Sequence, residues 1–444
     1  MKKNWLRKTV VTGAVLASVL LLGACGNSDN GGGDTGTAAQ SESNEPLKIW
    51  TTSNALKESA ENWGDETDKK VEVVVIPYSD FQTKLKQGIN DATTAPDVFI
   101  VSRDFVKEWS NRENAIVNLE KEFSEDVKKY KSDAFEDIVK FGSNDKDQLV
   151  AMTGEYPVGM MFYNRSIAKD VLGTDDPEDV AVAMDTVEKW QGINAKIKEK
   201  YAGKTKLFGT WEDTNNMLVQ QRTKPWVKDE TFTIDETFAD LFDQTEKMYQ
   251  ESMFVSEGEN EAYQAGYNQN IFFAQFLPSW GFSSKIRPQI QGKESAGNWG
   301  VTTPTYSYAR GGSYFFIAQN SANKKNAWEY VKSQTVDTDY LVADQKSKVG
   351  YPSSKKAAEE LVASGFSEPL LGDQKVYEMY QKQADVQSAE TKDVVTKYDG
   401  TILGFVNDLL KSYGAGNISK EDALKELGNK VKTAFPELKI VEKY

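Results

Sequence analysis

The side chains available for chemistry in this chain form a restricted set. The 444 residues contain no histidine and one cysteine, Cys25. Histidine-ligated zinc, Ser-His-Asp and Cys-His triads and histidine general bases are therefore impossible within the chain. Carboxylates, lysine, arginine, tyrosine and hydroxyl groups remain, and a pair of carboxylates is the one major hydrolytic arrangement that they allow. We expect neither a metal nor a cofactor.

The aromatic content suits a different task, the binding of a neutral sugar. Such a ligand presents many hydroxyl groups and an apolar ring face. Its site needs carboxylates, amides and arginine for the hydroxyls and flat aromatic side chains under the rings. The chain has 10 tryptophans and 19 tyrosines, so its composition permits this chemistry.

Cys25 follows a segment that is typical of a secretory signal. Four basic residues among the first eight precede an apolar run, Val10 to Leu22, which is too short to span a membrane. The motif Leu22-Gly23-Ala24-Cys25 resembles the bacterial lipobox, in which the chain is cut before the cysteine and its thiol is diacylated. We expect residues 1–24 to be a signal peptide and residues 25–46 to be a lipidated cysteine and a flexible Gly/Ser/Asn-rich linker. The alternative is a chance cysteine after an ordinary signal.

The charge of the chain limits its partners. The net charge is −14, and it becomes more negative once the basic signal is removed. An acidic exterior repels phosphate backbones and anionic lipid headgroups. We therefore expect no nucleic-acid partner and a membrane contact through the lipid alone, for which two acyl chains suffice.

Three short apolar segments alternate with helix-like segments at the start of the mature chain. The expected strands are Leu47–Trp50, Val71–Ile76 and Pro96–Val101. The second is nearly all apolar, which predicts a strand buried on both faces. Helices are expected between the strands, and Asp80 could cap the second of them. This order predicts an α/β domain with a parallel sheet.

The carboxyl ends of parallel strands are where a ligand binds in such a sheet. Each expected strand is followed by polar or aromatic residues. We expect these residues to lie together and to line one side of the binding site. The candidates are Trp50, Asn54, Asp80, Arg103 and Asp104. Arg103 offers a planar fork for vicinal hydroxyls, whereas Asp80 could instead serve only as the helix cap.

Seven segments in a fixed order carry a family resemblance. They are Ala95–Phe99, Tyr156–Arg165, Pro278–Trp280, Asn298–Val301, Gly311–Ala318, Ala327–Val331 and Gly416–Leu424. Behind a lipobox, they resemble the extracellular solute-binding proteins of ABC importers, the large sugar-binding group that includes maltodextrin-binding proteins. The resemblance covers nearly the whole mature chain.

The resemblance implies a periplasmic-binding-protein-like fold of type II. Two discontinuous α/β lobes would be joined by crossing segments, with the ligand cleft between the lobes. The implied lobes are residues 47–154 plus 312–365 and residues 155–311 plus 366–444. The implied crossings lie near Thr153–Tyr156, Ala309–Gly312 and Ser364–Leu371. The glycines at 311 and 312 could serve as a hinge or only as a tight turn.

The resemblance also implies further carbohydrate-binding residues. Asp104 matches the polar position after the Pro-Asp strand, and Trp280 matches an aromatic residue at a strand end. The other candidates are Glu155, Trp211, Glu212, Gly312, Tyr314 and Tyr398. For Trp211 and Trp280 the alternative is a position in the hydrophobic core.

The resemblance implies a receptor rather than an enzyme. It would be a monomer, held by lipid on the outer side of the cell membrane as in Gram-positive bacteria, and would deliver a carbohydrate, more readily an oligosaccharide, to an ABC permease. One alternative is a secreted glycoside hydrolase with Glu155 and Asp104 as its carboxylate pair. Another is a binding protein for a peptide or a polyamine, whose positive charge would suit the acidic chain.

Overall fold

The computed structural model describes residues 45–91, 93–390 and 394–443. The predicted signal peptide, Cys25 and nearly all of the linker lie outside the described residues. Within the described part of the chain, no helix is long and apolar enough to cross a membrane.

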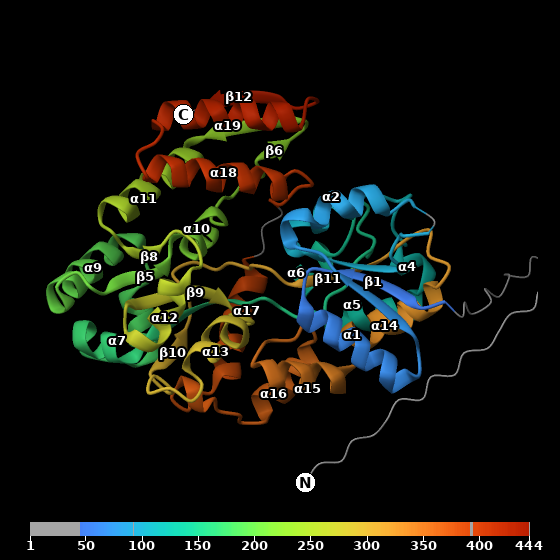
Figure 1. Ribbon diagram of the computed structural model, residues 1–444, viewed down its shortest axis with the longest axis horizontal. Helices are drawn as coiled ribbons and strands as arrows, with labels where there is room; N and C mark the ends of the chain where they lie inside the picture. The colour runs from blue at the N-terminus through green and yellow to red at the C-terminus, as the bar shows by residue number, and fades with distance from the viewer. Residues whose placement is uncertain (1–44, 92, 391–393, 444) are drawn as a thin grey trace, which may run out of the picture. The chain divides into compact units, whose positions relative to one another are not determined.

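The first sheet has four strands in the order β11-β3-β1-β2 (Figure 1). Strand β1 pairs in parallel with both β2 and β3, and β11 is antiparallel to β3. The elements are β1 (Leu47–Thr51), α1 (Asn54–Thr67), β2 (Val71–Val75), α2 (Tyr78–Gly88), β3 (Val98–Ser102) and β11 (Ser313–Ile317). The predicted alternation of strands and helices is confirmed, and the antiparallel β11 comes from a distant segment.

The prediction that Val71–Ile76 is buried on both faces is wrong. Strand β2 lies at the edge of its sheet and alternates between half-buried and exposed positions, with Val74 38% exposed. Helix α1 covers one face, where Gly64 lies against Val71, and the other face meets solvent. An apolar run therefore did not require burial on both sides, because alternate residues of a strand point to opposite faces.

The second predicted helix begins without the expected cap. Helix α2 starts at Tyr78, directly after its N-cap Pro77, and no side chain accepts a capping hydrogen bond there. Asp80 lies in the first turn instead, where a carboxylate is favourable next to the helix dipole. The predicted capping role of Asp80 is wrong.

The second sheet has five strands in the order β10-β4-β9-β5-β8. Strand β4 is antiparallel to β10 and β9, whereas β5 is parallel to β9 and β8. The strands are β4 (Gly159–Asn164), β5 (Lys206–Thr210), β8 (Phe254–Ser256), β9 (Phe272–Pro278) and β10 (Trp299–Thr302). Every residue of β4 and β9 is buried, so these two strands form the centre of the sheet.

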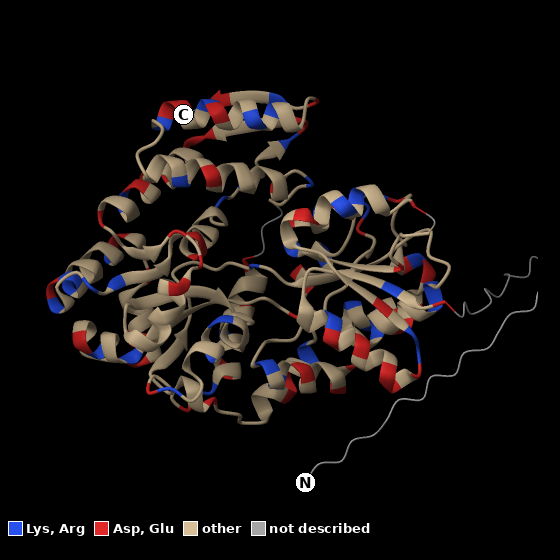
Figure 2. Ribbon diagram, viewed as in Figure 1, with Lys and Arg blue, Asp and Glu red and all other residues tan. Residues whose placement is uncertain are grey.

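A third sheet brings together the middle and the end of the chain. Its order is β12-β7-β6, and β12 is parallel to β7. Its strands and the helices beside it are β6 (Val227–Lys228), β7 (Thr231–Asp235), α11 (Glu236–Gln250), α18 (Asp399–Gly414), α19 (Lys420–Ala434) and β12 (Lys439–Lys443). Ser419 caps α19 by accepting from the backbone N–H of Asp422, as expected, and α19 carries charges of both signs (Figure 2).

The remaining helices cover the sheets or connect them. They are α3 (Arg103–Trp109), α4 (Leu119–Glu122), α5 (Ser124–Asp133), α6 (Glu136–Phe141), α7 (Arg165–Leu172), α8 (Pro177–Ala183), α9 (Val187–Tyr201), α10 (Trp211–Val219), α12 (Glu261–Gln269), η1 (Phe282–Ile286), α13 (Arg287–Ile290), α14 (Lys324–Thr335), α15 (Thr338–Lys348), α16 (Lys355–Ala363), η2 (Pro369–Leu371) and α17 (Val376–Ala389).

The chain passes repeatedly between the first and second sheets. It leaves the first sheet after α6 to enter β4 and returns from β10 to β11. Isolated β-bridges join these passages to one another and to a third segment: Met152 pairs with Phe315, Val158 with Ala309, and Glu155 with Pro352. The first sheet is therefore built from discontinuous stretches of sequence, residues 47–102 and 313–317.

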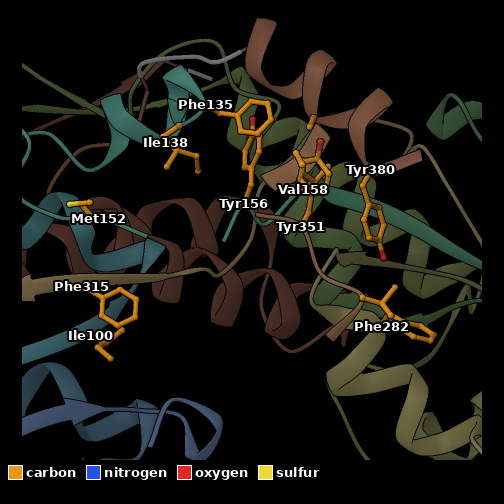
Figure 3. Close-up of a cluster of buried hydrophobic side chains, with 14 of the residues drawn as sticks. Ile100, Phe135, Ile138, Met152, Tyr156, Val158, Phe282, Phe315, Tyr351 and Tyr380 are labelled. Carbon is orange, nitrogen blue, oxygen red and sulfur yellow. The ribbon is translucent and has the colours of Figure 1, made fainter. Parts of the chain in front are cut away.

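A hydrophobic cluster fills the region around these passages (Figure 3). Phe135 and Tyr156 lie with ring centroids 4.8 Å apart, and the Tyr351 ring lies 6.5 Å from that of Tyr156. The same cluster includes Phe315 of the first sheet and Val158 next to the second. The passages are thus packed segments rather than exposed tethers.

Candidate ligand-binding site

A cavity of about 160 Å³ lies where several of these segments converge. Helices α3 and α6, beside the first sheet, line one part of it. The segment after α10, the passage into β11, the end of α17 and the start of α18 line the rest. Residues that are hundreds of positions apart in the sequence therefore line the same cavity.

Arg103 is held in place at the start of α3. Its guanidinium carbon lies 3.7 Å from the centroid of the Phe141 ring, which also lines the cavity. Its Nη1 donates to the hydroxyl of Tyr314 at 3.3 Å, and its backbone N–H donates to the carbonyl of Gly312 at 3.2 Å. These contacts fix a planar cation at the cavity wall.

Asp104, the next residue, also lines the cavity. The Tyr78 hydroxyl donates to Asp104 Oδ2 at 3.1 Å. Burial and then the charge of Asp104 raise the pKa of Tyr78, so this hydroxyl remains a donor. A Cβ added at Gly400 would lie 2.7 Å from the Asp104 carbonyl oxygen, so only glycine permits the observed approach of α18 to α3.

Asp137 of α6 supplies a buried carboxylate. Its residue exposure is 5%, and its Oδ2 accepts from the Tyr156 hydroxyl at 2.8 Å. Its Oδ1 has no hydrogen-bond partner among the described residues. Burial raises the pKa of Asp137, and the nearby charge of Arg103 partly opposes this shift.

Arg222 supplies a buried cation on the other side of the cavity. It forms an ion pair with Asp399 at the start of α18, and both side chains are 8% exposed. Its guanidinium carbon lies 3.8 Å from the centroid of the Trp226 ring, and Nη2 also donates to the Val394 carbonyl at 3.3 Å. Its Nε and Nη1 have no partner within the described chain.

A second polar group surrounds Arg310, in the passage between β10 and β11. Its guanidinium pairs with Asp213 and lies 3.6 Å from Glu212 Oε1, both in the first turn of α10. Burial lowers the pKa of Arg310, whereas the charges of Glu212 and Asp104 oppose the shift. The Trp280 Nε1 donates to the Arg310 carbonyl at 2.9 Å, and the ring lies against Gly311, whose φ is +70°.

The structure brings some of the predicted site residues together. Arg103 and Asp104 line the cavity. Gly312 and Tyr314 contact Arg103, although the Tyr314 side chain is itself fully buried. Glu212 and Trp280 belong to the group around Arg310 instead.

Glu155 lies at the first passage and does not line the cavity. Its Oε1 accepts from the backbone N–H of Ser313 at 2.8 Å. Burial raises the pKa of Glu155, and the charge of Lys348 opposes that shift. Glu155 therefore joins two neighbouring passages.

Other predicted residues lie apart from the cavity. Trp50 packs against Gly88, and Asn54 and Asp80 are exposed on α1 and α2. Trp211 opens α10 rather than a loop and is fully buried, and Tyr398 packs edge-on against Phe435 with ring centroids 4.9 Å apart. The position of a residue after a strand therefore does not determine the direction of its side chain.

Several cavity residues were not predicted. They are Asp137, Phe141, Arg222 and Trp226. None follows a predicted strand of the first sheet, and the Arg222–Asp399 pair joins positions far apart in sequence. Asp399, which directly follows the predicted Tyr398, lines the cavity and pairs with Arg222. Among the described residues, no cluster of acidic side chains could hold a metal ion.

Comparison with known proteins identifies the class. Residues 50–342 match the model of a family described as bacterial extracellular solute-binding protein. The chain therefore belongs to this family of solute-binding proteins. A comparison with curated protein sequences returned no match.

Several solved structures share the fold of this chain. One described as an extracellular solute-binding protein family 1 gives a TM-score of 0.74 at 15% identity, over 88% of this chain and 99% of the other. The ABC transporter associated binding protein from B. animalis subsp. lactis Bl-04, in complex with β-1,6-galactobiose, gives a TM-score of 0.70 at 16% identity, over 90% of this chain and 99% of the other. The Thermus thermophilus maltotriose binding protein gives 0.64 at 15%, over 87% and 99%. The predicted periplasmic-binding-protein-like fold of type II is confirmed.

Proposed function

We propose that this chain is the lipid-anchored, extracellular solute-binding subunit of an ABC importer and that it binds a carbohydrate. The cavity between the segments of the first and second sheets carries this proposal. Phe141 and Trp226 line it, and the guanidinium groups of Arg103 and Arg222 lie against their rings. Charged and polar groups at a cavity wall suit a ligand with a rim of hydroxyl groups.

The ligand would lie between two lobes. We keep the boundaries 47–154 plus 312–365 and 155–311 plus 366–444 as a proposal. From the predicted set, Arg103, Asp104, Glu212 and Trp280 are our candidates for sugar contacts. Closure of the lobes on the ligand would produce the form that the permease recognises.

An oligosaccharide is the proposed ligand. One structure of the same fold is a complex with β-1,6-galactobiose, and another is a maltotriose binding protein bound with maltotriose. The group around Arg310, which includes Trp280, lies outside the cavity lining and offers a second aromatic and polar surface for a further sugar unit.

The anchor is proposed from the N-terminal sequence. Cys25 would carry two acyl chains after cleavage before it, and residues 26–46 would tether the folded part near the permease. The proposed function requires no chemical reaction, because the protein would bind the carbohydrate and deliver it to the permease.

A sugar panel tests the proposal. The purified protein is screened by thermal denaturation and tryptophan fluorescence against neutral mono- and oligosaccharides, peptides and polyamines. A sugar at 100 times its Kd should add about 2.7 kcal/mol to the free energy of unfolding. A shift with a peptide or polyamine and with no sugar would contradict it, and release of reducing ends on long incubation would favour a hydrolase.

A further inference from the structure

Helices α3 and α18 belong to different hydrophobic clusters and yet touch each other. Val106 of α3 lies in a cluster with Phe99 of the first sheet, which we call the first-sheet cluster. Ile402 of α18 lies in a cluster with Phe276 of the second sheet, the second-sheet cluster. Both helices line the cavity. A contact between them therefore joins the two parts of the protein that enclose it.

The contact is made at Gly400, in the first turn of α18. A Cβ at this position would lie 2.7 Å from the carbonyl oxygen of Asp104 and 2.9 Å from the ring of Phe105, both in α3. The close approach therefore depends on the absence of a side chain at Gly400. Val395, which precedes α18, packs against the first-sheet cluster, as Phe105 does. The start of α18 and the chain before it thus both reach the side of the first sheet.

The same stretch of chain is fixed to the side of the second sheet. Tyr398 belongs to the second-sheet cluster. Arg222, in the connection after α10, donates to the carbonyl of Val394 at 3.3 Å and forms the buried ion pair with Asp399. The Thr396 hydroxyl donates to Asp399 Oδ1 at 2.7 Å. Arg222 therefore holds both ends of this stretch against the second-sheet side.

Four residues of this stretch also line the cavity: Val394, Val395, Asp399 and Gly400. We infer that residues 394–400 form a clasp that holds α3 and α18 together beside the cavity before any ligand binds, and that Arg222 is the positioning residue of this clasp. The inference rests on the proposed function, in which the ligand lies between two lobes that close. A ligand would meet a site that a contact within the protein has already partly closed, so loosening the clasp would weaken the binding of every ligand by the same factor.

Distances between two spin labels on the ligand-free protein test the clasp. Cys25 is the only cysteine in the sequence, so the full chain with Cys25→Ser can be labelled at two introduced cysteines. Thr83→Cys on α2 and Lys425→Cys on α19 replace exposed residues. Helix α2 packs in the first-sheet cluster and α19 in the second-sheet cluster, so each label reports on its own side. Pulsed electron paramagnetic resonance should show the clasped arrangement as a short-distance component.

Two glycines of α18 provide a matched pair of variants. Gly400→Ala brings a methyl group against Asp104 and Phe105, so the ratio of the short-distance to the long-distance component should fall at least about tenfold. Gly404→Ala meets nothing within 4 Å and should leave the distribution unchanged. Thermal melting verifies that each variant is folded.

Two further variants loosen the clasp without adding atoms to the contact. Val395→Ser removes the apolar side chain that packs against the first-sheet cluster, and it carries the test if Gly400→Ala does not fold. Arg222→Lys keeps the charge but lacks the planar fork that reaches both Val394 and Asp399. Both substitutions should lower the short-distance component.

The clasp and the proposed function fail in different measurements. Absence of the short-distance component from the labelled parent protein would overturn the clasp, as would a distribution that neither Gly400→Ala nor Val395→Ser changes. Either result leaves the carbohydrate function standing. For any sugars that bind, Val395→Ser should weaken all of them by the same factor in calorimetry, and a loss confined to one sugar would contradict the clasp. If no sugar binds, the proposed function is overturned, whereas the distances still decide whether the clasp exists.

Discussion

The Trp280 indole donates from Nε1 to the carbonyl of Arg310 at 2.9 Å. This bond ties the segment after β9 of the second sheet to the passage that leads into β11 of the first. Arg310 in turn pairs with the first turn of α10 through Glu212 and Asp213. The tryptophan and arginine therefore connect the two sheets next to the proposed ligand cleft.

Substitution of Trp280 should weaken sugar binding. Trp280→Ala removes both the ring and the donor, and we expect the affinity to fall about tenfold or more, as is usual for a buried aromatic anchor. Trp280→Phe keeps a flat ring and should retain part of the affinity. Calorimetry measures both, and Trp109→Phe in the buried core of the first sheet is the control. Unchanged affinity in Trp280→Ala would remove Trp280 from the site.

The Arg222–Asp399 ion pair should contribute strongly to stability. Asp399→Asn leaves a buried guanidinium without its charged partner, which costs about 3–5 kcal/mol when such a pair is broken. Urea denaturation measures the loss. Asp408→Asn on the same helix is exposed and should change the free energy of unfolding by less than about 0.5 kcal/mol. Equal effects of the two substitutions would show that the pair is not buried in solution.

Two glycines on α18 should differ sharply. Gly400→Ala would place a Cβ 2.7 Å from the Asp104 carbonyl, so we expect a loss of roughly 1–3 kcal/mol and weaker ligand binding. Gly404→Ala meets nothing within 4 Å, and the better helix former should raise stability by about 0.5–1 kcal/mol. Thermal melting compares the two variants, and similar effects would contradict the close approach of α18 to α3.

The raised pKa of Glu155 predicts a pH dependence. Its folded pKa lies above its ordinary value of 4.5, because burial outweighs the hydrogen bond from Ser313 and the charge of Lys348. The folded state therefore binds the proton more tightly than the unfolded state. The resulting contribution to stability is fully present below pH 4.5 and is lost as the pH rises through the folded pKa.

Glu155→Gln removes this titration. The wild type should lose stability relative to the variant as the pH rises from about 4 to 7. Denaturant titrations of both proteins across that range measure the difference. A difference that stays constant with pH would show that Glu155 titrates normally in the folded protein.

Cys25→Ser tests the anchor independently of the site. We expect sugar affinity to be unchanged, because no residue proposed for the site lies near Cys25 in the sequence, while the protein is lost from cells into the medium. Fractionation and immunoblotting of the two strains measure the distribution. Equal retention on cells would refute lipid anchoring and leave the binding proposal standing.

The sequence predicted the elements whose signals are local. The β-branched runs at Val71–Val75 and Val98–Ser102 gave two strands of the first sheet, and Ser419 marked the start of α19. The third sheet was missed, because β7 and β12 are short, half-exposed strands that pair across some two hundred residues. Pairing over such a separation leaves no pattern in either segment.

Only some residues of the site were predicted, because only these have a signal in the local sequence. Arg103 and Asp104 follow a strand directly, so their position was visible in the sequence. Arg222 lies in a connecting segment and Asp137 on the short helix α6, and the two residues reach the same cavity only through the tertiary fold. Trp211 is buried where α10 meets α11, with its ring centroid 6.5 Å from that of Tyr249, a contact that no local spacing reveals.

The most direct measurement is calorimetric titration of the purified wild-type protein with a panel of neutral oligosaccharides. The proposed function predicts that at least one of them binds with one-to-one stoichiometry and that Trp280→Ala weakens this binding. Absence of binding by every sugar in the panel, together with binding of a peptide or a polyamine, would contradict the account.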